Sequence, residues 1–258
     1  MRLLYEIYQY REMICSLIRR DLRGRYKGSV LGFLWTFLNP LLQLGVYTLV
    51  FSVIMRNGIA DYYMFLFVAL VPWMFFSVSL TNGASCILSQ KDMVQKIYFP
   101  RQVLPIAFVT SQFINMLLSF LVIFAVLIVS GKGWHWIAVY FLPFIFLIEY
   151  LLALGIALLV SAVTVYFRDL EYILGILTMA WQFLSPVIYS IEQVPENLRT
   201  IFLLNPMTSV LTAYRDILYY KQIPKIQTLC HAFGVSIVLF AAGWIVFKKL
   251  ERRFAEEL

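Results

Sequence analysis

The sequence predicts an all-α integral membrane protein with six transmembrane helices. Of its 258 residues, 62% are hydrophobic and 14% are charged, whereas a soluble domain has about 45–50% apolar and about 25% charged residues. A soluble protein of this size could not bury such an apolar excess and keep a polar surface, so a soluble enzyme is excluded. The formal charge of +7 lies between the apolar runs, as membrane-flanking charges do, and we expect no nucleic acid partner.

Six apolar runs are long enough to cross a bilayer. A helix needs about 20 apolar residues to span about 30 Å of hydrocarbon, and at this length in lipid only a helix satisfies its own backbone within one segment. The predicted spans are residues 28–55, 62–83, 102–130, 136–165, 171–189 and 226–247.

The fourth predicted span contains an acid in its interior, Glu149, whereas Glu171 stands at the very start of the fifth span. An ionisable residue in the membrane is a functional candidate by default. A proton relay usually needs a chain of such groups, so we interpret Glu149 as a hydrogen-bonded structural carboxyl.

Residues 1–27 precede the first span and predict a basic amphipathic helix. One helical face holds apolar residues, and the opposite face is polar; the apolar face consists of Leu3, Ile7, Tyr10, Ile14, Leu17 and Ile18. Such a helix lies flat in the membrane interface, although an ordinary juxtamembrane anchor has the same composition. We expect no removable signal peptide here.

The positive charges predict the orientation of the chain. With the N-terminus inside, fifteen of the 21 Lys and Arg residues fall on the inner side. The positive-inside rule therefore places both termini, and the tail 248–258, in the cytoplasm.

Two connecting segments have compositions that a plain loop does not need. The inner segment 85–99 mixes apolar Met93, Val94 and Ile97 with charged residues, which suits docking on a soluble partner. The outer segment 190–222 contains a short apolar run broken by Asn205 and Pro206. Since proline interrupts a helix, we expect two short helices here, sheltered by protein or water.

The chain lacks the sequence features of an enzyme. It has no Gly-x-x-x-x-Gly-Lys-Ser/Thr phosphate loop, so we expect no ATP hydrolysis by this chain alone. His135 and His231 are far apart, without clustered carboxylates, which predicts no metal site. The three cysteines fit no disulfide framework. We expect the chain to bind no cofactor.

Five ordered segments resemble the permease subunit of ABC-2 type exporters for lipid-linked polysaccharides such as O-antigen, capsule or teichoic acid. They are LIRRDLRGRYKGSVLGFLWTFLNP (17–40), KIYFPRQVLP (96–105), YFRDL (166–170), SPVIY (185–189) and LNPM (204–207). No one segment is decisive, but the ordered set covers nearly the whole chain. Many relatives carry Arg-Glu where this chain has Arg101-Gln102, so we infer no ion pair there.

The resemblance implies a transporter in the bacterial inner membrane, built from two copies of this chain and two ATPase subunits that bind ATP and Mg²⁺. It implies that the inner segment is a coupling helix whose ATPase contacts are Gln90, Lys91, Asp92, Met93, Val94 and Lys96. It implies a polymer path along the dimer interface, lined from the first and fifth spans; the path residues are Phe33, Trp35, Phe37, Trp181, Phe183 and Tyr189. It also implies that the outer segment 190–222 is a gate hairpin, whose gate residues are Pro195, Asn205, Pro206 and Tyr214.

Three alternatives stay open. An ABC-2 permease for a small lipid or drug has the same architecture. A membrane-embedded sugar transferase needs catalytic carboxylates, for which only Glu192 and Glu196 are weak candidates. A proton-coupled transporter needs more buried acids and often shows an internal repeat, and we find neither.

Overall fold

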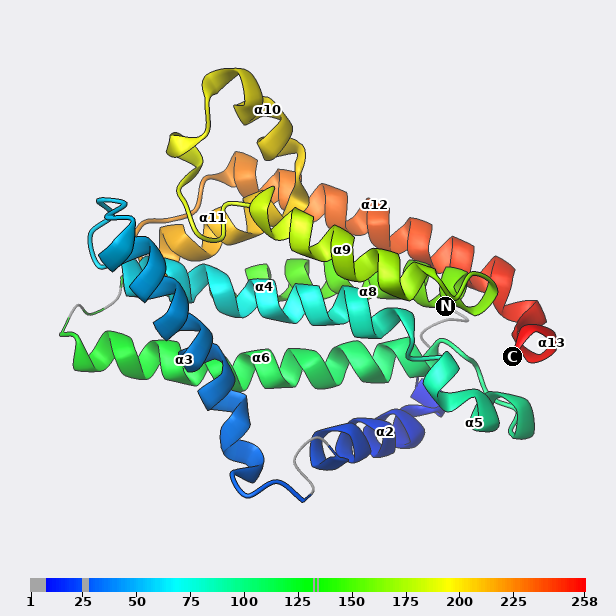
Figure 1. Ribbon diagram of the computed structural model, residues 1–258. Helices are drawn as coiled ribbons and strands as arrows, with labels where there is room; N and C mark the ends of the chain where they lie inside the picture. Colours follow the sequence, from blue (N-terminus) through cyan, green and yellow to red (C-terminus); the bar gives the residue numbers. More distant parts are fainter. Residues whose placement is uncertain (1–7, 25–27, 132, 134) are drawn as a thin grey trace.

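A computed structural model of the protein (Figure 1) describes residues 8–24, 28–131, 133 and 135–258. The structure over these ranges consists of helices and turns, without a strand. Five helical segments are long and apolar enough to cross a membrane. They are η1–α3–η2 (Gly32–Ile54), α4 (Tyr62–Ala84), α6 (Val103–Val129), α7–α8 (Trp136–Tyr166) and α12 (Ile226–Leu250) with η5 (Glu251–Arg253).

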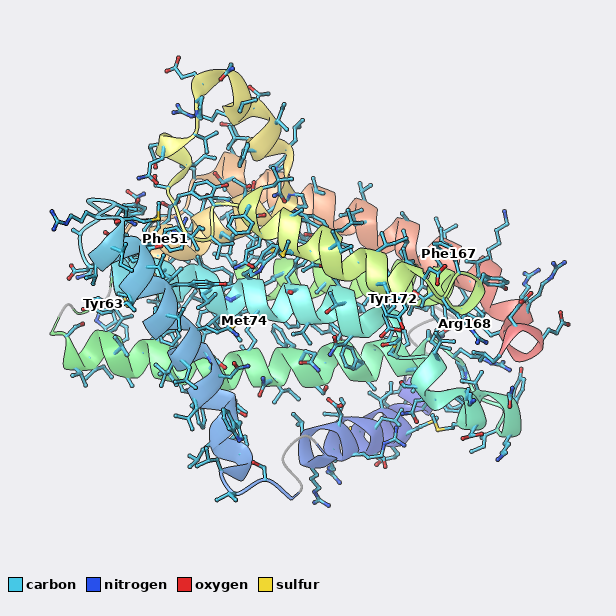
Figure 2. All side chains as sticks on the ribbon, viewed as in Figure 1. Phe51, Tyr63, Met74, Phe167, Arg168 and Tyr172 are labelled. Carbon is cyan, nitrogen blue, oxygen red and sulfur yellow. The ribbon has the colours of Figure 1, made fainter. Side chains whose placement is uncertain are left out.

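The helix α4 forms the centre of the bundle. It is hydrophobic around its whole circumference, which is the pattern of a fully surrounded helix, and α3, α6, α8, α9 and α11 all pack against it. Figure 2 shows Phe51 and Tyr63 at one end of the bundle. Phe167, Arg168 and Tyr172 lie at the opposite end, where α8 passes into α9.

The helices α8 (Leu142–Tyr166) and α12 pack against each other at a crossing of small residues. A Cβ atom on Gly243 would overlap the carbonyl oxygen of Gly155, and one on Gly155 would lie 2.5 Å from Cα of Phe240. Small residues allow helix backbones to approach closely in membrane proteins. These two glycines therefore set the separation of the two helices.

The predicted fifth span is only partly helical. Helix α9 (Leu170–Phe183) has 14 residues and ends six residues before the predicted end at 189. Its length is about 21 Å, and residues 184–190 continue as turns. Pro186 explains this end, since proline lacks an N–H and disfavours helical geometry at the residue before it.

Shorter helices occupy the two ends of the bundle. At the end predicted to be inner are η3 (Leu88–Gln90), α5 (Lys91–Lys96) and α13 (Phe254–Glu257); α13 packs against α5. At the other end are η4 (Ile191–Gln193), α10 (Glu196–Leu204) and α11 (Pro206–Leu218). Helix α10 stands away from the bundle at the top of Figure 1, whereas α11 packs on α4, α8 and α12.

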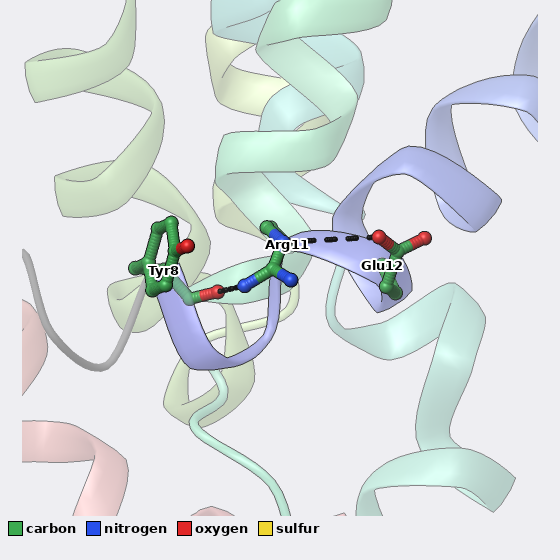
Figure 3. Close-up of polar contacts among 3 residues, drawn as sticks. All are labelled: Tyr8, Arg11 and Glu12. Atoms are coloured by element: carbon green, nitrogen blue, oxygen red, sulfur yellow. Dashed lines mark hydrogen bonds and ion pairs between the residues drawn. The ribbon is translucent and has the colours of Figure 1, made fainter.

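The N-terminal helix α2 (Arg11–Gly24) packs along α6 and buries Ile14 and Leu17. Leu3 and Ile7 of the predicted apolar face lie outside the described residues. Arg11 donates a hydrogen bond to the Tyr8 carbonyl (3.2 Å) and lies 3.8 Å from the carboxylate of Glu12 (Figure 3). All three side chains are exposed, so these contacts contribute little stability.

Candidate functional site

The end of the bundle predicted to be inner presents the segment predicted to couple to an ATPase. Gln90 accepts a hydrogen bond from Arg20 of α2 (2.9 Å). Lys91, Asp92 and Lys96 are exposed, and Met93 is half-buried against the core. Val94 is only 1% exposed within this chain. The side chain of Val94 therefore faces the bundle and is not available for a surface contact.

Two exposed apolar residues lie next to α5: Ile97, which the sequence placed in the docking segment, and Tyr98, which was not predicted. Ile97 is 54% exposed and Tyr98 is 88% exposed. The guanidinium of Arg101 lies 5.8 Å from the centre of the Tyr98 ring. Their position in the segment KIYFPR was the available signal, but a six-residue helix gives too little periodicity to tell which side faces outward.

Helices α3 (Trp35–Thr48) and α9 leave most of their apolar side chains uncovered. Phe33 of η1 and Trp35 at the start of α3 are exposed, and Phe37 packs edge-on against Phe33 with ring centres 5.4 Å apart. Farther along, Gln182 of α9 donates to the hydroxyl of Tyr47 (3.3 Å). The other exposed apolar side chains of this region include Leu42 and Val46 on α3, Leu49 and Val53 on η2, and Ile176, Leu177, Met179 and Phe183 on α9.

The turns after α9 are stabilised by side chains that donate hydrogen bonds to their carbonyl groups. Arg215 of α11 donates to the carbonyls of Pro186 (2.5 Å), Val187 (2.7 Å) and Tyr189 (3.2 Å). Its guanidinium also lies 3.6 Å from the ring centre of Phe65. The charge is buried without a carboxylate in these contacts, so carbonyl dipoles and the face of an aromatic ring stabilise it.

Two tyrosine hydroxyls also donate hydrogen bonds to carbonyls at the end of α9 and in the same turns. Tyr62 of α4 donates to the carbonyl of Ile188 (2.8 Å), and the hydroxyl of Tyr189 donates to the carbonyl of Phe183 (2.6 Å). An irregular backbone survives at membrane depth only where the protein or a water-filled cavity covers it. Here protein side chains supply that cover.

Asn205 connects this segment to the α10–α11 turn. Its Oδ1 accepts from the backbone N–H of Met207 (3.0 Å) and caps α11, and it also accepts from the indole of Trp181 (3.1 Å). Its Nδ2 donates to the carbonyl of Leu184 (3.2 Å) and to the Ser185 hydroxyl (2.8 Å). Pro206 follows at the first position of α11, where its missing N–H costs nothing.

The remaining residues of the predicted gate lie in two different environments. Pro195 is exposed and precedes α10. Tyr214 is fully buried, and its hydroxyl donates to Oε2 of Glu149 (2.6 Å). The side chain of Tyr214 is therefore part of the core, and the hydrogen bond agrees with the structural role expected for Glu149.

At the end predicted to be outer, a cavity of about 890 Å³ lies beside α10, α11 and the start of α12. Hydroxyl, amide and charged groups line it, and Ser209 and His231 form a hydrogen bond there (3.0 Å). In the part of the chain that the structure describes, no three His, Cys, Asp or Glu side chains are grouped so as to hold a metal ion.

Residues 12–219 match the family described as ABC-2 type transporter. The chain belongs to the ABC-2 type transporter family. This ABC-2 chain is 40% identical to the O-antigen export system permease protein RfbA of Myxococcus xanthus, over all of this chain and 99% of the relative. It is 29% identical to RfbA of Klebsiella pneumoniae over 100% and 99% of the two chains. It is 24% identical to the polysialic acid transport protein KpsM of Escherichia coli, over 92% of each.

The geometry of this ABC-2 chain brings several predicted residues together and separates others. Trp181, Asn205 and Pro206 meet at one junction, and Tyr189 lies in the turns beside it. Phe33, Trp35 and Phe37 lie near the start of α3. Arg215 and Tyr62 were not among the residues predicted from the sequence.

Proposed function

We propose that this chain is the membrane subunit of an ATP-driven exporter that moves a lipid-linked polysaccharide across the bacterial cytoplasmic membrane. The observation that carries the proposal is the 40% identity, over the whole chain, to an O-antigen export permease. The similarity to a polysialic acid transport protein over 92% of each chain supports the same class of cargo. ATP and Mg²⁺ belong to a separate ATPase subunit, since this chain has no phosphate loop.

In this proposal the chain crosses the membrane six times, with both termini in the cytoplasm. Five crossings are the long helices, and the sixth is α9 continued by residues 184–190. Helix α9 reaches about 21 Å, so the turns must complete the crossing. The hydrogen bonds from Arg215, Tyr62 and Asn205 to their carbonyls support this assignment, because lipid offers the backbone no partner.

The uncovered apolar faces of α3 and α9 support assembly of two copies, with the polymer path between them. Only 11% of the apolar window in the first span is buried within the chain. The aromatic residues Phe33, Trp35, Phe37, Trp181, Phe183 and Tyr189 then supply faces against which sugar rings can pack.

Two ATPase subunits would dock at the cytoplasmic end, on η3 and α5. The proposed contact surface contains Gln90, Lys91, Asp92, Met93 and Lys96, and it adds the exposed Ile97 and Tyr98. Val94 is left out because it is buried. Helix α2, joined to this surface through Arg20 and Gln90, would lie at the cytoplasmic interface.

At the outer end, the hairpin of α10 and α11 would re-enter the membrane and close the path at rest. Helix α11 is largely buried, whereas α10 has no buried residue. This difference supports a fixed α11 and an α10 that parts for the polymer, with Pro195, Asn205 and Pro206 at its two ends.

The test is transport by the chain together with its ATPase in proteoliposomes that contain lipid-linked glycan. We expect ATP-dependent transfer of the glycan across the bilayer, and accumulation of lipid-linked glycan, seen by mass spectrometry, in a strain lacking this chain. ATP-dependent movement of phospholipid or drug without glycan transfer would instead establish the small-substrate alternative. ATP hydrolysis by the purified chain alone would contradict the proposal.

A further inference from the structure

A second cavity, separate from the outer one, lies between α3, α4 and α6 and has a volume of about 400 Å³. Its residues on α6 run from Gln112 to Ser119, which places them about 14 to 24 Å along that helix from its start at Val103. Met74, labelled on α4 in Figure 2, lies beside α3 and lines the same space. The cavity is therefore near the middle of the predicted bilayer.

The polar lining of this cavity is unusual for such a depth. Side-chain amides and hydroxyls from α3 and α6 line it, namely those of Thr36, Asn39, Gln112, Asn115 and Ser119. Gln112 is 4% exposed, and its Nε2 is buried without a hydrogen-bond partner. A buried amide without a partner is costly. The cavity thus offers a hydrogen-bond donor that awaits an acceptor.

The lining discriminates between classes of ligand. Among the described residues that line the cavity none is charged, so a phosphate or other anion would find no counter-charge there. A hydrocarbon chain would leave the amide of Gln112 unsatisfied. A neutral, hydroxyl-rich molecule fits, since hydroxyl groups both donate to and accept from amides. The volume also lies within the range of small-molecule sites, about 300–1,000 Å³.

The mouth of the cavity supplies an aromatic surface and an access route. Trp35 is 41% exposed and Asn39 is also exposed, both on α3. Gln43 donates to Oδ1 of Asn39 (3.3 Å) and orients that amide. The apolar face of an indole can pack on the C–H face of a sugar ring while amides bind its hydroxyls. The cavity thus opens on the face of α3 that the proposed function assigns to the polymer path.

We propose that this cavity is a saccharide-binding subsite, in which the amide of Gln112 donates to a sugar hydroxyl and Trp35 packs against the ring. The proposal rests on the proposed function, because it takes the polymer itself as the source of the sugar.

The test uses the purified complex of this chain with its ATPase. The probes are inorganic phosphate and the methyl glycosides of mannose, galactose, glucose and N-acetylglucosamine. Saturation-transfer NMR titration measures the binding of each probe. We expect at least one glycoside to bind. The change Gln112→Leu should weaken that binding by about three- to tenfold, because one neutral hydrogen bond typically contributes about that much to affinity. The change Trp35→Ala, at the exposed mouth, should also weaken it and does not disturb the core.

The matched control is Gln95→Leu, the same change on the exposed surface of α5 outside the cavity and the path, which should leave glycoside affinity unchanged. Binding that is equal in the wild-type and Gln112→Leu complexes would overturn the proposal. So would the absence of binding by all four glycosides, or binding of phosphate that depends on Gln112. Transport of lipid-linked glycan by a wild-type complex that binds no glycoside would overturn this subsite and leave the exporter function standing. Glycoside binding that depends on Gln112, in a complex that moves no glycan, would support this subsite and contradict the exporter function.

Discussion

The indole Nε1–H of Trp181 donates a hydrogen bond to Oδ1 of Asn205 over 3.1 Å. This bond joins α9, a predicted wall of the path, to the first turn of α11, a predicted part of the gate. The same Asn205 side chain caps α11 and binds the carbonyl of Leu184. One amide therefore joins the end of α9 and the turn after it to the start of α11, which follows 21 to 24 residues later in the chain.

The first prediction concerns Asn205→Ala. This change removes the cap of α11 and the partners of Leu184 and Trp181, so we expect the free energy of unfolding to fall by about 1–3 kcal/mol. Thermal unfolding of the purified complex measures it. The control is Asn197→Ala on α10, where the side chain is exposed. Equal stability of the Asn205→Ala and Asn197→Ala complexes would contradict the role of Asn205.

The second prediction concerns Arg215. The change Arg215→Met leaves several buried carbonyls without their donors, and we expect a loss of more than about 3 kcal/mol in unfolding free energy. Arg215→Lys should recover only a small part, because an ammonium group cannot copy a planar fork of donors. The control Lys225→Met removes an exposed charge nearby. A fully stable Arg215→Lys protein would show that charge alone, and not fork geometry, matters.

The third prediction tests the contact between Glu149 and Tyr214. We expect Tyr214→Phe to lower the free energy of unfolding by about 1–3 kcal/mol, since it takes a donor away from a buried carboxyl. Glu149→Gln keeps an oxygen that can accept from Tyr214, so its cost should be smaller and transport should continue. Loss of transport by a well-folded Glu149→Gln protein would revive the proton-relay interpretation of this acid.

The fourth prediction concerns the crossing of α8 and α12. The change Gly243→Ala would force the added methyl group into the backbone at Gly155, and we expect a loss of at least about 1–3 kcal/mol from overpacking. Gly234→Ala on the same helix has open space around the added methyl group and should be neutral or slightly stabilising. Comparison of the two unfolding temperatures measures the difference. Equal temperatures would show that the helices separate at little cost.

The fifth prediction concerns docking of the ATPase. The change Ile97→Asp places a charge on the exposed apolar part of the proposed contact surface, and a buried unpaired charge costs several kcal/mol. We expect the ATPase to be lost on co-purification while the permease stays in the membrane. Gln95→Asp, on the exposed surface of α5, is the control for added charge. Normal co-purification of the Ile97→Asp protein would remove Ile97 from the contact surface.

The long helices were predictable because each corresponds to a long apolar run, interrupted by a charge only at Glu149 of α8, and hydrophobic length determines whether such a run can cross a membrane. The early end of α9 was predictable in principle, since Pro186 stands in the sequence. The residues around Pro186 are apolar, however, so the hydrophobic run continues past the end of the helix. Amphipathic periodicity likewise indicated α2, where Ile14 and Leu17 are buried.

The role of Arg215 was not predictable in the same way. A charge between two apolar runs has the composition of a membrane-flanking residue, and nothing local distinguishes a buried one. Its partners in the turns after α9 lie 26 to 29 residues earlier in the chain, and Phe65 lies 150 residues earlier, so only tertiary packing brings them together. The orientations of Val94 and Tyr214 have the same origin, because a short helix acquires an inside and an outside only from its neighbours.

The hydrogen bonds from Arg215 to the segment after α9 reach main-chain oxygens, which every amino acid possesses. These hydrogen bonds therefore do not depend on which side chains the bound residues carry. Over generations, side chains at the end of α9 can be exchanged for others without a matching change on α11. A transporter lineage can in this way adapt to a new polymer while its scaffold stays constant. For the protein engineer, the same segment is a natural place to graft residues from a relative with a different cargo.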